Sequence, residues 1–302
     1  MKSINSFFLW RINWYEKVIP KNKPYKRNCD MNFASGYPEG MRRIALGIEY
    51  AGHLFHGFQA QAHDTTTVQS GLEQALSKIA NEPIKLVCAG RTDAGVHATN
   101  QVIHFDTMAQ RLDRAWLRGA NGRLPDGISI RWMKNVSPKF HSRFSAQHRT
   151  YRYVIYNTPT PSALLTHYVT WDRRKLDLDA MIDASKALVG EHDFSAFRAA
   201  QCQAHTAIRQ MHAINISRQR DFIVIEVQAS AFLYHMVRNI VGVLTTIAAG
   251  EQAVSWSAEV LNSRDRKCGG ITAPADGLYL VAIDYPSEHD LPIRSKGPYF
   301  LA

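Results

Sequence analysis

Asp93 lies in the short segment of the sequence that is best suited to chemistry. Residues 89–98 read AGRTDAGVHA, so two glycines bracket an arginine and a carboxylate that are two residues apart. Gly90 and Gly95 permit the positive φ angles and the close backbone approach that a tight loop beside a ligand needs. A carboxylate held in such a loop could act as a nucleophile. The same pattern also fits an Asx turn at Asp93 beside a solvated Arg91, and spacing alone leaves both interpretations open.

The Asp93 loop is predicted to connect two strands of a β-α-β-β-α-β unit. Apolar and polar residues alternate along 42–50, which is the pattern of a half-buried strand. From residue 68 apolar residues recur at helical spacing, and Thr67 is placed to cap that helix. The predicted elements of this half are, in order, 42–50, 68–79, 84–88, 101–105, 113–120 and 128–133.

The second half of the chain repeats this order. Its predicted elements are 149–156, 178–189 (a helix that ends at Gly190), 211–217, 222–228, 232–249 and 278–283. A β-α-β-β-α-β order is the split-βαβ topology. We therefore expect an α+β fold of two ferredoxin-like, RRM-like units whose sheets join around a central cleft. The expected units are 41–140, which carries the Asp93 loop, and 141–302, with an exposed insertion near 158–175.

Composition indicates a globular protein, and its charge fits either an anionic partner or a basic enzyme without one. The chain has 302 residues, of which 45% are apolar and 21% are charged, as in ordinary soluble domains. Its 36 Lys and Arg exceed its 26 Asp and Glu, and the formal charge of +10 favours nucleic acid through phosphate neutralisation. A basic enzyme without such a partner would have the same charge. The cysteines form no C-x-x-C pair, which argues against a disulfide scaffold and a structural zinc site.

Two features of the sequence bear on its location in the cell. No stretch has the length and apolar character of a membrane span, and the apolar residues 7–10 are followed by Arg11, unlike a secretory signal. We therefore expect a cytoplasmic protein without a membrane partner. Residues 1–40 are basic and lack a regular pattern. They are predicted to be a disordered extension or the product of a misplaced start, with Met31 or Met41 as the real first residue.

The residues around Asp93 resemble a known signature. The stretch GRTDAGVHA at 90–98 is similar to that of the bacterial tRNA pseudouridine synthase A family. Other similar stretches follow in the family's order between residue 42 and the end of the chain: GIEY at 47–50, GFQ at 57–59, TVQ at 67–69, RTYRY at 149–153, HDF at 192–194, HMVRNIVG at 235–242 and GLYL at 277–280. The first forty residues have no counterpart in this pattern.

The resemblance implies an isomerase that converts uridine to pseudouridine at positions 38, 39 and 40 in the anticodon stem and loop of tRNA. The reaction breaks the N1–C1′ bond, turns the uracil and rejoins it through C5, and it needs no cofactor. Asp93 matches the family's catalytic aspartate and is predicted to be the nucleophile, because a carboxylate can also act as a leaving group. Attack on C1′, addition to the uracil ring and removal of a sugar proton all stay open.

Three more residues are predicted to bind the substrate. Tyr151 matches the family's active-site tyrosine, which can stack on a flipped uracil. Arg238 matches an arginine that is expected to pair with the Asp93 carboxylate and keep it ionised. Arg91 is assigned to a phosphate of the extruded nucleotide. Taken singly, Tyr151 also fits a strand core, and each arginine also fits a solvated surface.

The predicted partners are tRNA and, by resemblance, a second copy of the chain in a homodimer. No metal is expected, because the histidines have no H-E-x-x-H pattern or carboxylate cluster beside them, and His97 fits a loop-stabilising role better. The main alternative is an RNA-binding or RNA-folding protein on the same scaffold with little catalysis. The joint presence of the three matched site residues argues against it. Ala51, Phe58 and Ala60 depart from the family's pattern in a loop expected to touch RNA.

Overall fold

The first half of the chain contains the predicted elements in the predicted order. The computed structural model describes residues 37–61 and 66–301, so most of the predicted extension 1–40 lies outside the described residues. The elements are β1 (Arg42–Tyr50), α2 (Val68–Ala80), β2 (Val87–Cys88), β3 (His97–Thr107), the π-helix η2 (Ala115–Gly119) and β4 (Ile128–Val136). Thr67 caps α2 as predicted, because its side chain accepts a hydrogen bond from the Ser70 amide. The strand predicted at 84–88 is shorter, since only its last two residues pair with β3.

The second half also follows the predicted order, with additions. Its elements are β5 (His148–Tyr156), β6 (Thr170–Trp171), α3 (Leu178–Lys186), β7 (Gly190–Asp193), β8 (Ile208–Gln219), β9 (Phe222–Ala229), α4 (Met236–Ala248), α5 (Trp256–Ser263) and β10 (Leu278–Asp284). The prediction that α3 reaches residue 189 is wrong, since Gly190, at a φ of 119°, opens a strand and does not cap the helix. The prediction that α4 begins at 232 is also wrong, because His235 is left-handed and cannot continue a helix.

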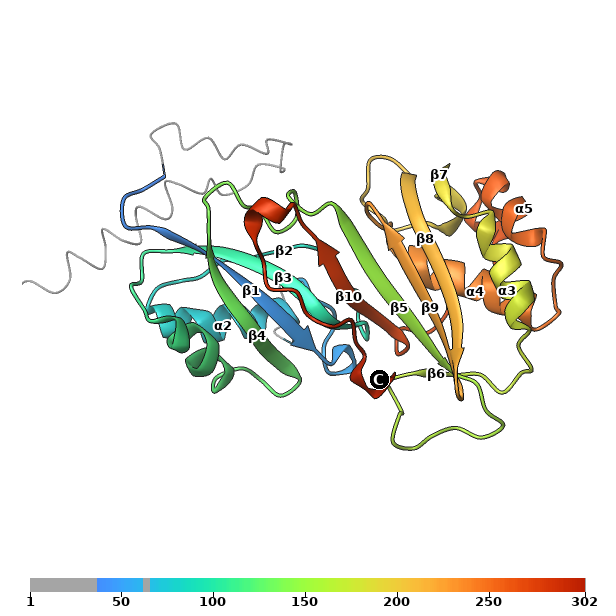
Figure 1. Ribbon diagram of the computed structural model, residues 1–302, viewed down its shortest axis with the longest axis horizontal. Coiled ribbons are helices and arrows are strands. Elements are labelled where there is room, and N and C mark those ends of the chain that lie inside the picture. Colours follow the sequence, from blue (N-terminus) through green and yellow to red (C-terminus); the bar gives the residue numbers. More distant parts are fainter. Residues whose placement is uncertain (1–36, 62–65, 302) are drawn as a thin grey trace, which may run out of the picture. The chain divides into compact units, whose positions relative to one another are not determined.

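The ten strands of the described residues belong to one mixed sheet that runs through both halves (Figure 1). The order along the sheet is β4-β1-β3-β10-β5-β9-β8-β7, while β2 pairs with β3 and β6 pairs with β5. The halves meet where β3 and β10 run parallel, with Tyr279 opposite His97 and Leu280 opposite Ala98. This confirms the predicted α+β fold with joined sheets. The last strand of the chain thus lies against the strand that follows the Asp93 loop.

The main core lies on the face of the sheet that the helices cover. Side chains alternate along a strand, so Ile44 and Leu46 of β1 share one face and pack with Leu72 of α2. In the second half the same cluster continues from Tyr151 of β5 to Ile240 of α4. Burying each large apolar side chain contributes about 1.5–3 kcal/mol, so this cluster fixes the elements that carry the candidate site. Among the described residues, no helix is both long and apolar enough to cross a membrane.

Candidate active site around Asp93

The Asp93 loop is held on both sides by side chains of the sheet. Buried Gln101 of β3 donates a hydrogen bond to the Gly90 carbonyl (2.6 Å) and accepts one from the Gly90 amide (3.4 Å). On the other side of Gly90, the Thr92 hydroxyl bonds the buried Tyr50 hydroxyl at 2.7 Å. Gly95 ends the loop at a φ of +83°, and a Cβ there would lie 2.9 Å from the Ala275 Cβ. These contacts fix the backbone from which Asp93 projects.

The two glycines of the loop have different roles. The prediction of a positive φ holds for Gly95, whereas Gly90 is not among the glycines with positive φ. A Cβ at Gly90 would lie 3.8 Å from the Tyr151 hydroxyl, which is ordinary contact. The predicted close backbone approach at Gly90 is therefore not seen, since a Cβ would fit there, whereas Gly95 supplies the turn.

The carboxylate of Asp93 is largely buried and lies beside two nitrogen-bearing side chains. Its side chain is 21% exposed, and its Oδ2 lies 4.0 Å from Arg238 Nη1 and 3.6 Å from His235 Nε2. Burial raises the pKa of Asp93 from its usual 3.8 to about 6, although the positive charge of Arg238 opposes this shift. At neutral pH the group is mostly ionised, and at mildly acidic pH it is mostly protonated.

Arg238 reaches Asp93 from the first turn of α4. Its Nε donates a hydrogen bond to the Ala273 carbonyl (2.7 Å), and the Ala273 amide donates one to the Arg238 carbonyl (3.1 Å). The side chain is 16% exposed. Since one edge of the guanidinium is tied to residue 273, the other is left for the carboxylate. The structure therefore brings Arg238 to Asp93, as expected, although at a distance longer than a hydrogen bond.

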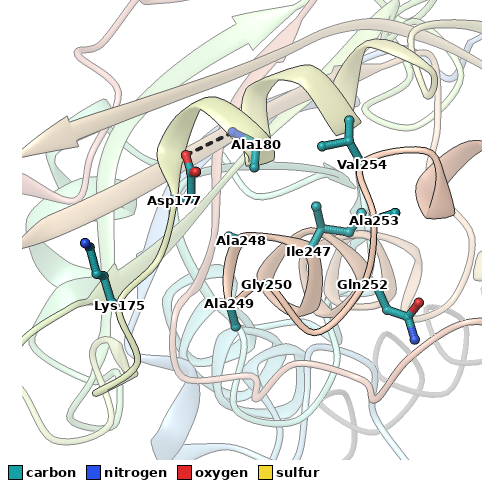
Figure 2. A pocket seen from close by; sticks show the side chains of 10 residues that line it. All are labelled: Lys175, Asp177, Ala180, Ile247, Ala248, Ala249, Gly250, Gln252, Ala253 and Val254. Carbon is teal, nitrogen blue, oxygen red and sulfur yellow. Dashed lines mark hydrogen bonds between the residues drawn. The ribbon is translucent and has the colours of Figure 1, made fainter.

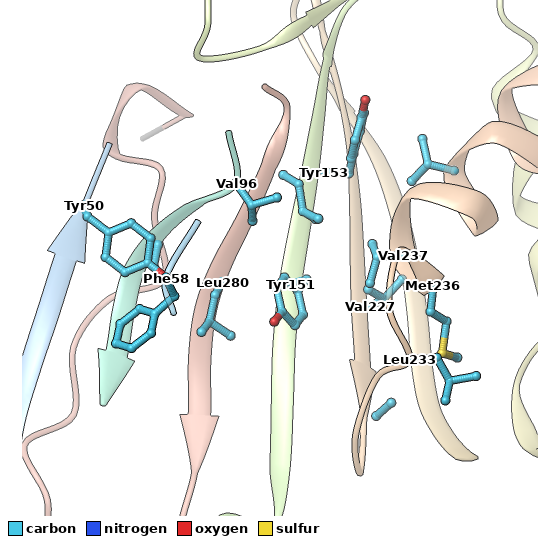
Figure 3. Packing of buried hydrophobic residues seen from close by; sticks show 14 of the residues in the cluster. Tyr50, Phe58, Val96, Tyr151, Tyr153, Val227, Leu233, Met236, Val237 and Leu280 are labelled. Carbon is cyan, nitrogen blue, oxygen red and sulfur yellow. The ribbon is translucent and has the colours of Figure 1, made fainter. Parts of the chain in front are cut away.

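Tyr151 lies in the middle of the sheet, beside the loop. Figure 3 shows it on β5 between Leu280 of β10 and Val227 of β9, its register partners. Its ring packs edge-on against Phe232 at 5.0 Å, and 8% of the residue is exposed. Burial, and then the charge of Asp93, raise the pKa of Tyr151, so its hydroxyl stays protonated. Tyr151 is thus a core residue and also a neighbour of Asp93, so the two interpretations of it are compatible.

Arg91 stands apart from this group. It is exposed, and it makes no hydrogen bond or ion pair with residues 37–61 or 66–301. The structure does not bring it to Asp93, although the two are only two residues apart in the chain. Arg91 thus presents a solvated guanidinium on the surface of the loop.

The comparisons with known proteins agree on one family. The sequence profile of the family described as tRNA pseudouridine synthase matches residues 48–145 and 184–286, more than half of the chain. The tRNA pseudouridine synthase A of Pseudoalteromonas atlantica is 55% identical over 260 residues, which are 86% of this chain and 98% of that protein. The protein of the same name from Pseudomonas aeruginosa is 51% identical over 263 residues, 87% and 92% of the two chains.

The chain belongs to the tRNA pseudouridine synthase A family. A solved structure of a Cbf5-Nop10-Gar1 complex is also similar, with a TM-score of 0.32 and 12% identity over 78% of this chain and 48% of that one. The profile covers Asp93, Arg91 and Arg238 but not Tyr151, which lies between its two matched ranges. The identities with the two relatives extend over most of the chain.

Sequence patterns did not identify two residues that lie around the candidate site. His235 stands in the stretch HMVRNIVG, but nothing in that pattern distinguishes it from a helix-surface histidine. Arg266 is the other. It donates to the Asn239 Oδ1 (3.1 Å), the Thr272 hydroxyl (3.0 Å) and the Gly270 carbonyl (2.9 Å). Arg266 thus ties α4 to the segment 270–273, whose last carbonyl binds the Arg238 side chain. Its partners are distant in sequence or unpatterned, and no local signal predicts them.

His97 is a structural residue of the loop, as predicted. Its Nδ1 accepts a hydrogen bond from the Gly52 amide (3.1 Å), so Nε2 carries the proton and donates to the His167 carbonyl (2.8 Å). Burial lowers the pKa of His97 to about 4, which keeps the ring neutral. Within the part of the chain that the structure describes, no group of three or more His, Cys, Asp or Glu side chains could hold a metal ion.

A separate cavity lies between the start of α3 and the end of α4 (Figure 2). It encloses about 590 Å³, and Asp177 at its rim caps α3 by accepting a hydrogen bond from the Ala180 amide. Apart from Asp177, Lys175 and Gln252, its lining consists of Ala, Ile, Val and Gly. The lining is thus mostly apolar, and the Asp177 carboxylate is engaged in capping α3.

Proposed function

We propose that this member of the tRNA pseudouridine synthase A family isomerises uridine to pseudouridine at positions 38, 39 and 40 in the anticodon stem and loop of tRNA, with Asp93 as the nucleophile. Family membership makes the chain an isomerase that acts on tRNA. The observation that carries the role of Asp93 is its setting: a mostly buried carboxylate that lies 4.0 Å from Arg238 and whose charge adds to burial in raising the pKa of Tyr151. The net charge of +10 suits an RNA partner.

The proposed chemistry balances without a cofactor. A carboxylate oxygen of Asp93 attacks C1′ as the N1–C1′ bond breaks, which leaves the electron pair on the uracil. After the ring turns, C5 attacks C1′ and expels the carboxylate, the C5 proton leaves and N1 gains a proton. Arg238 favours the ionised carboxylate before and after the cycle. Tyr151 offers a neutral hydroxyl and an aromatic face to the detached uracil, and Arg91 binds a phosphate of the extruded nucleotide.

An alternative role for Asp93 is to remove a proton from the sugar, because a carboxylate whose pKa is raised toward neutrality also suits a general base. Deuterium at C2′ of the target uridine separates the two roles. We expect a single-turnover rate within about 20% of that of the unlabelled tRNA, since no C2′–H bond breaks in nucleophilic attack. A severalfold slower rate would show that Asp93 acts as a general base and not as a nucleophile.

The partners and location of the enzyme are proposed on the same grounds. A tRNA substrate is consistent with an enzyme of the cytoplasm, and we propose that two copies of the chain form a homodimer that binds it. Light scattering of the purified protein tests the dimer directly. A mass near 68 kDa, twice the 34.1 kDa of the chain, is expected, and the mass of a single chain at micromolar concentration would contradict it.

The target positions are tested with unmodified tRNA transcripts that keep uridine at only one of positions 38, 39 and 40. Carbodiimide mapping by primer extension should find pseudouridine at that position after treatment with the wild type, and none with Asp93→Asn. Asp221→Asn, in the exposed turn between β8 and β9, is a matched control and should modify normally. Pseudouridine at other positions would contradict the specificity. Tight, salt-sensitive binding without product would instead favour the RNA-binding alternative.

A further inference from the structure

We propose that His235 is a positioning residue that holds one oxygen of the Asp93 carboxylate, so that the other oxygen is the one that meets the substrate. The inference rests on the proposed role of Asp93 and deepens it, because it assigns separate tasks to the two carboxylate oxygens. Nothing in the sequence pattern alone gives His235 this role.

The geometry around Asp93 is one-sided. The nearest approach of His235, through Nε2 at 3.6 Å, and the nearest approach of Arg238, through Nη1 at 4.0 Å, both fall on Oδ2. The three side chains are 23%, 16% and 21% exposed, for His235, Arg238 and Asp93 in turn, so water competes little for these contacts. Oδ1 is the oxygen left for C1′.

The position of the His235 ring is imposed by the backbone and by its neighbours. The residue is left-handed (φ 60°, ψ 5°), a conformation that costs energy for a side chain with a Cβ and that His, Asn and Asp adopt more readily than others. Its carbonyl accepts the Asn239 amide (2.9 Å) and so opens α4. Its ring stacks on Tyr234 at 4.0 Å and 27°. The Tyr234 amide is in turn held by the Cys202 sulfur (3.5 Å).

The His235 ring acts as a neutral donor and not as a cation. Burial and then the positive charges of Arg238 and Arg266 lower its pKa. Asp93 and Tyr234 are the other titratable groups that face it. An ionised carboxylate only accepts hydrogen bonds, so the Nε2 that points at Oδ2 carries the proton. The separation of 3.6 Å is slightly beyond hydrogen-bond length, and such contacts commonly tighten when substrate binds.

A matched pair of variants separates positioning from a merely structural role. His235→Asn keeps a residue type that tolerates the left-handed backbone, but its amide is too short to reach Oδ2. His235→Gln keeps an N–H donor at about the reach of Nε2. Both are measured as the full-length protein by single-turnover conversion of a tRNA transcript between pH 5 and 8, with urea unfolding as a check of folding.

We expect His235→Asn to lower the single-turnover rate about tenfold, the loss of one hydrogen bond to a charged group, with the apparent Kd for tRNA unchanged within about twofold. The fall of its rate in acid should begin at a higher pH than in the wild type, because the ionised form of Asp93 loses a hydrogen-bond donor and its pKa rises. His235→Gln should restore most of the rate, and its rate should fall in acid at nearly the wild-type pH. Wild-type behaviour of both variants would overturn the inference. Equal losses of rate in both variants, with the wild-type pH dependence, would also overturn it. A wild type that forms no product would overturn the proposed function itself, and this inference with it.

Discussion

At the level of single residues, the proposed chemistry depends on Asp93 and its neighbours. The carboxylate is kept partly out of water, which raises its pKa, and is faced by Arg238, which lowers it, and the first effect is the larger. The pairing of Asp93 with Arg238 was predictable from the family pattern. The tie between Arg238 and Ala273 was not, because it joins two segments 35 residues apart and involves a backbone carbonyl that any residue could offer.

The rate should fall in mild acid, because protonated Asp93 is not a nucleophile. With a pKa of about 6, the ionised fraction falls nearly tenfold for each pH unit below that value. We expect kcat/KM for tRNA to be level above pH 7 and about tenfold lower at pH 5, measured in buffers of constant ionic strength. A rate that stays level down to pH 5 would show that the reacting group has an ordinary carboxylate pKa.

Removing the charge of Asp93 should stabilise the fold. The pKa of Asp93 is raised from 3.8 to about 6, so the native state binds the proton more tightly than the unfolded chain. Its contribution to stability is therefore most favourable below pH 4 and is lost as the pH rises through 6. Asp93→Asn should increase the free energy of unfolding by on the order of 2 kcal/mol at pH 7 and by little at pH 4. Urea unfolding at the two pH values measures this, and a gain that is equal at both would contradict the explanation.

At the scale of elements, the sequence predicted what depends on local pattern. The strands β1, β5, β9 and β10 and the start of α2 followed from alternation and capping. The start of α4 did not, because apolar residues continue at helical spacing through Phe232 and Leu233 while the left-handed His235 breaks the helix. The π geometry of 115–119 has no sequence signal of its own. The parallel pairing of β3 with β10 depends on contacts across most of the chain.

Gly242 lets α4 pack closely on the segment 271–273, whose last carbonyl binds the Arg238 side chain. A Cβ at this position would overlap the carbonyl oxygen of Ile271, which is backbone and cannot rotate away. Gly242→Ala should lower the free energy of unfolding by about 3 kcal/mol, the upper range for overpacking, and lower activity by displacing Arg238. Gly122→Ala is the matched control, since its nearest contacts are at 3.8 Å. Urea unfolding of both variants checks this, and equal stabilities would contradict the close approach.

At the scale of the whole molecule, the candidate site is built from both halves of the sheet. The loop that carries Asp93 belongs to the first half, whereas Tyr151 and Arg238 come from β5 and α4 of the second. The junction of β3 with β10 lies between them, so the joining of the sheets is what assembles the site. The boundaries of the two units at residue 140 stay a prediction.

The excess of positive charge predicts binding that weakens with salt. Each phosphate that the protein neutralises releases counterions, so one lost contact reduces the slope of log K against log salt by about 0.7–0.9. Arg91→Gln should reduce the slope for tRNA by this amount. Arg220→Gln, at an exposed turn between β8 and β9, should leave it unchanged. Filter binding at several salt concentrations measures the slopes. An unchanged slope for Arg91→Gln would contradict the assignment of Arg91 to a phosphate.

The role of Asp93 as nucleophile is tested most sharply by the release of tritium from a tRNA transcript that carries 5-tritiated uridine. Isomerisation replaces the C5–H bond by a C5–C1′ bond, so each pseudouridine formed frees one tritium. The wild type and Asp221→Asn should release tritium at similar rates, while Asp93→Ala and Asp93→Asn should release none. Release by either Asp93 variant at a rate within about tenfold of the wild type would contradict the assignment of Asp93 as nucleophile, because a carboxylate with that role cannot be removed at so small a loss.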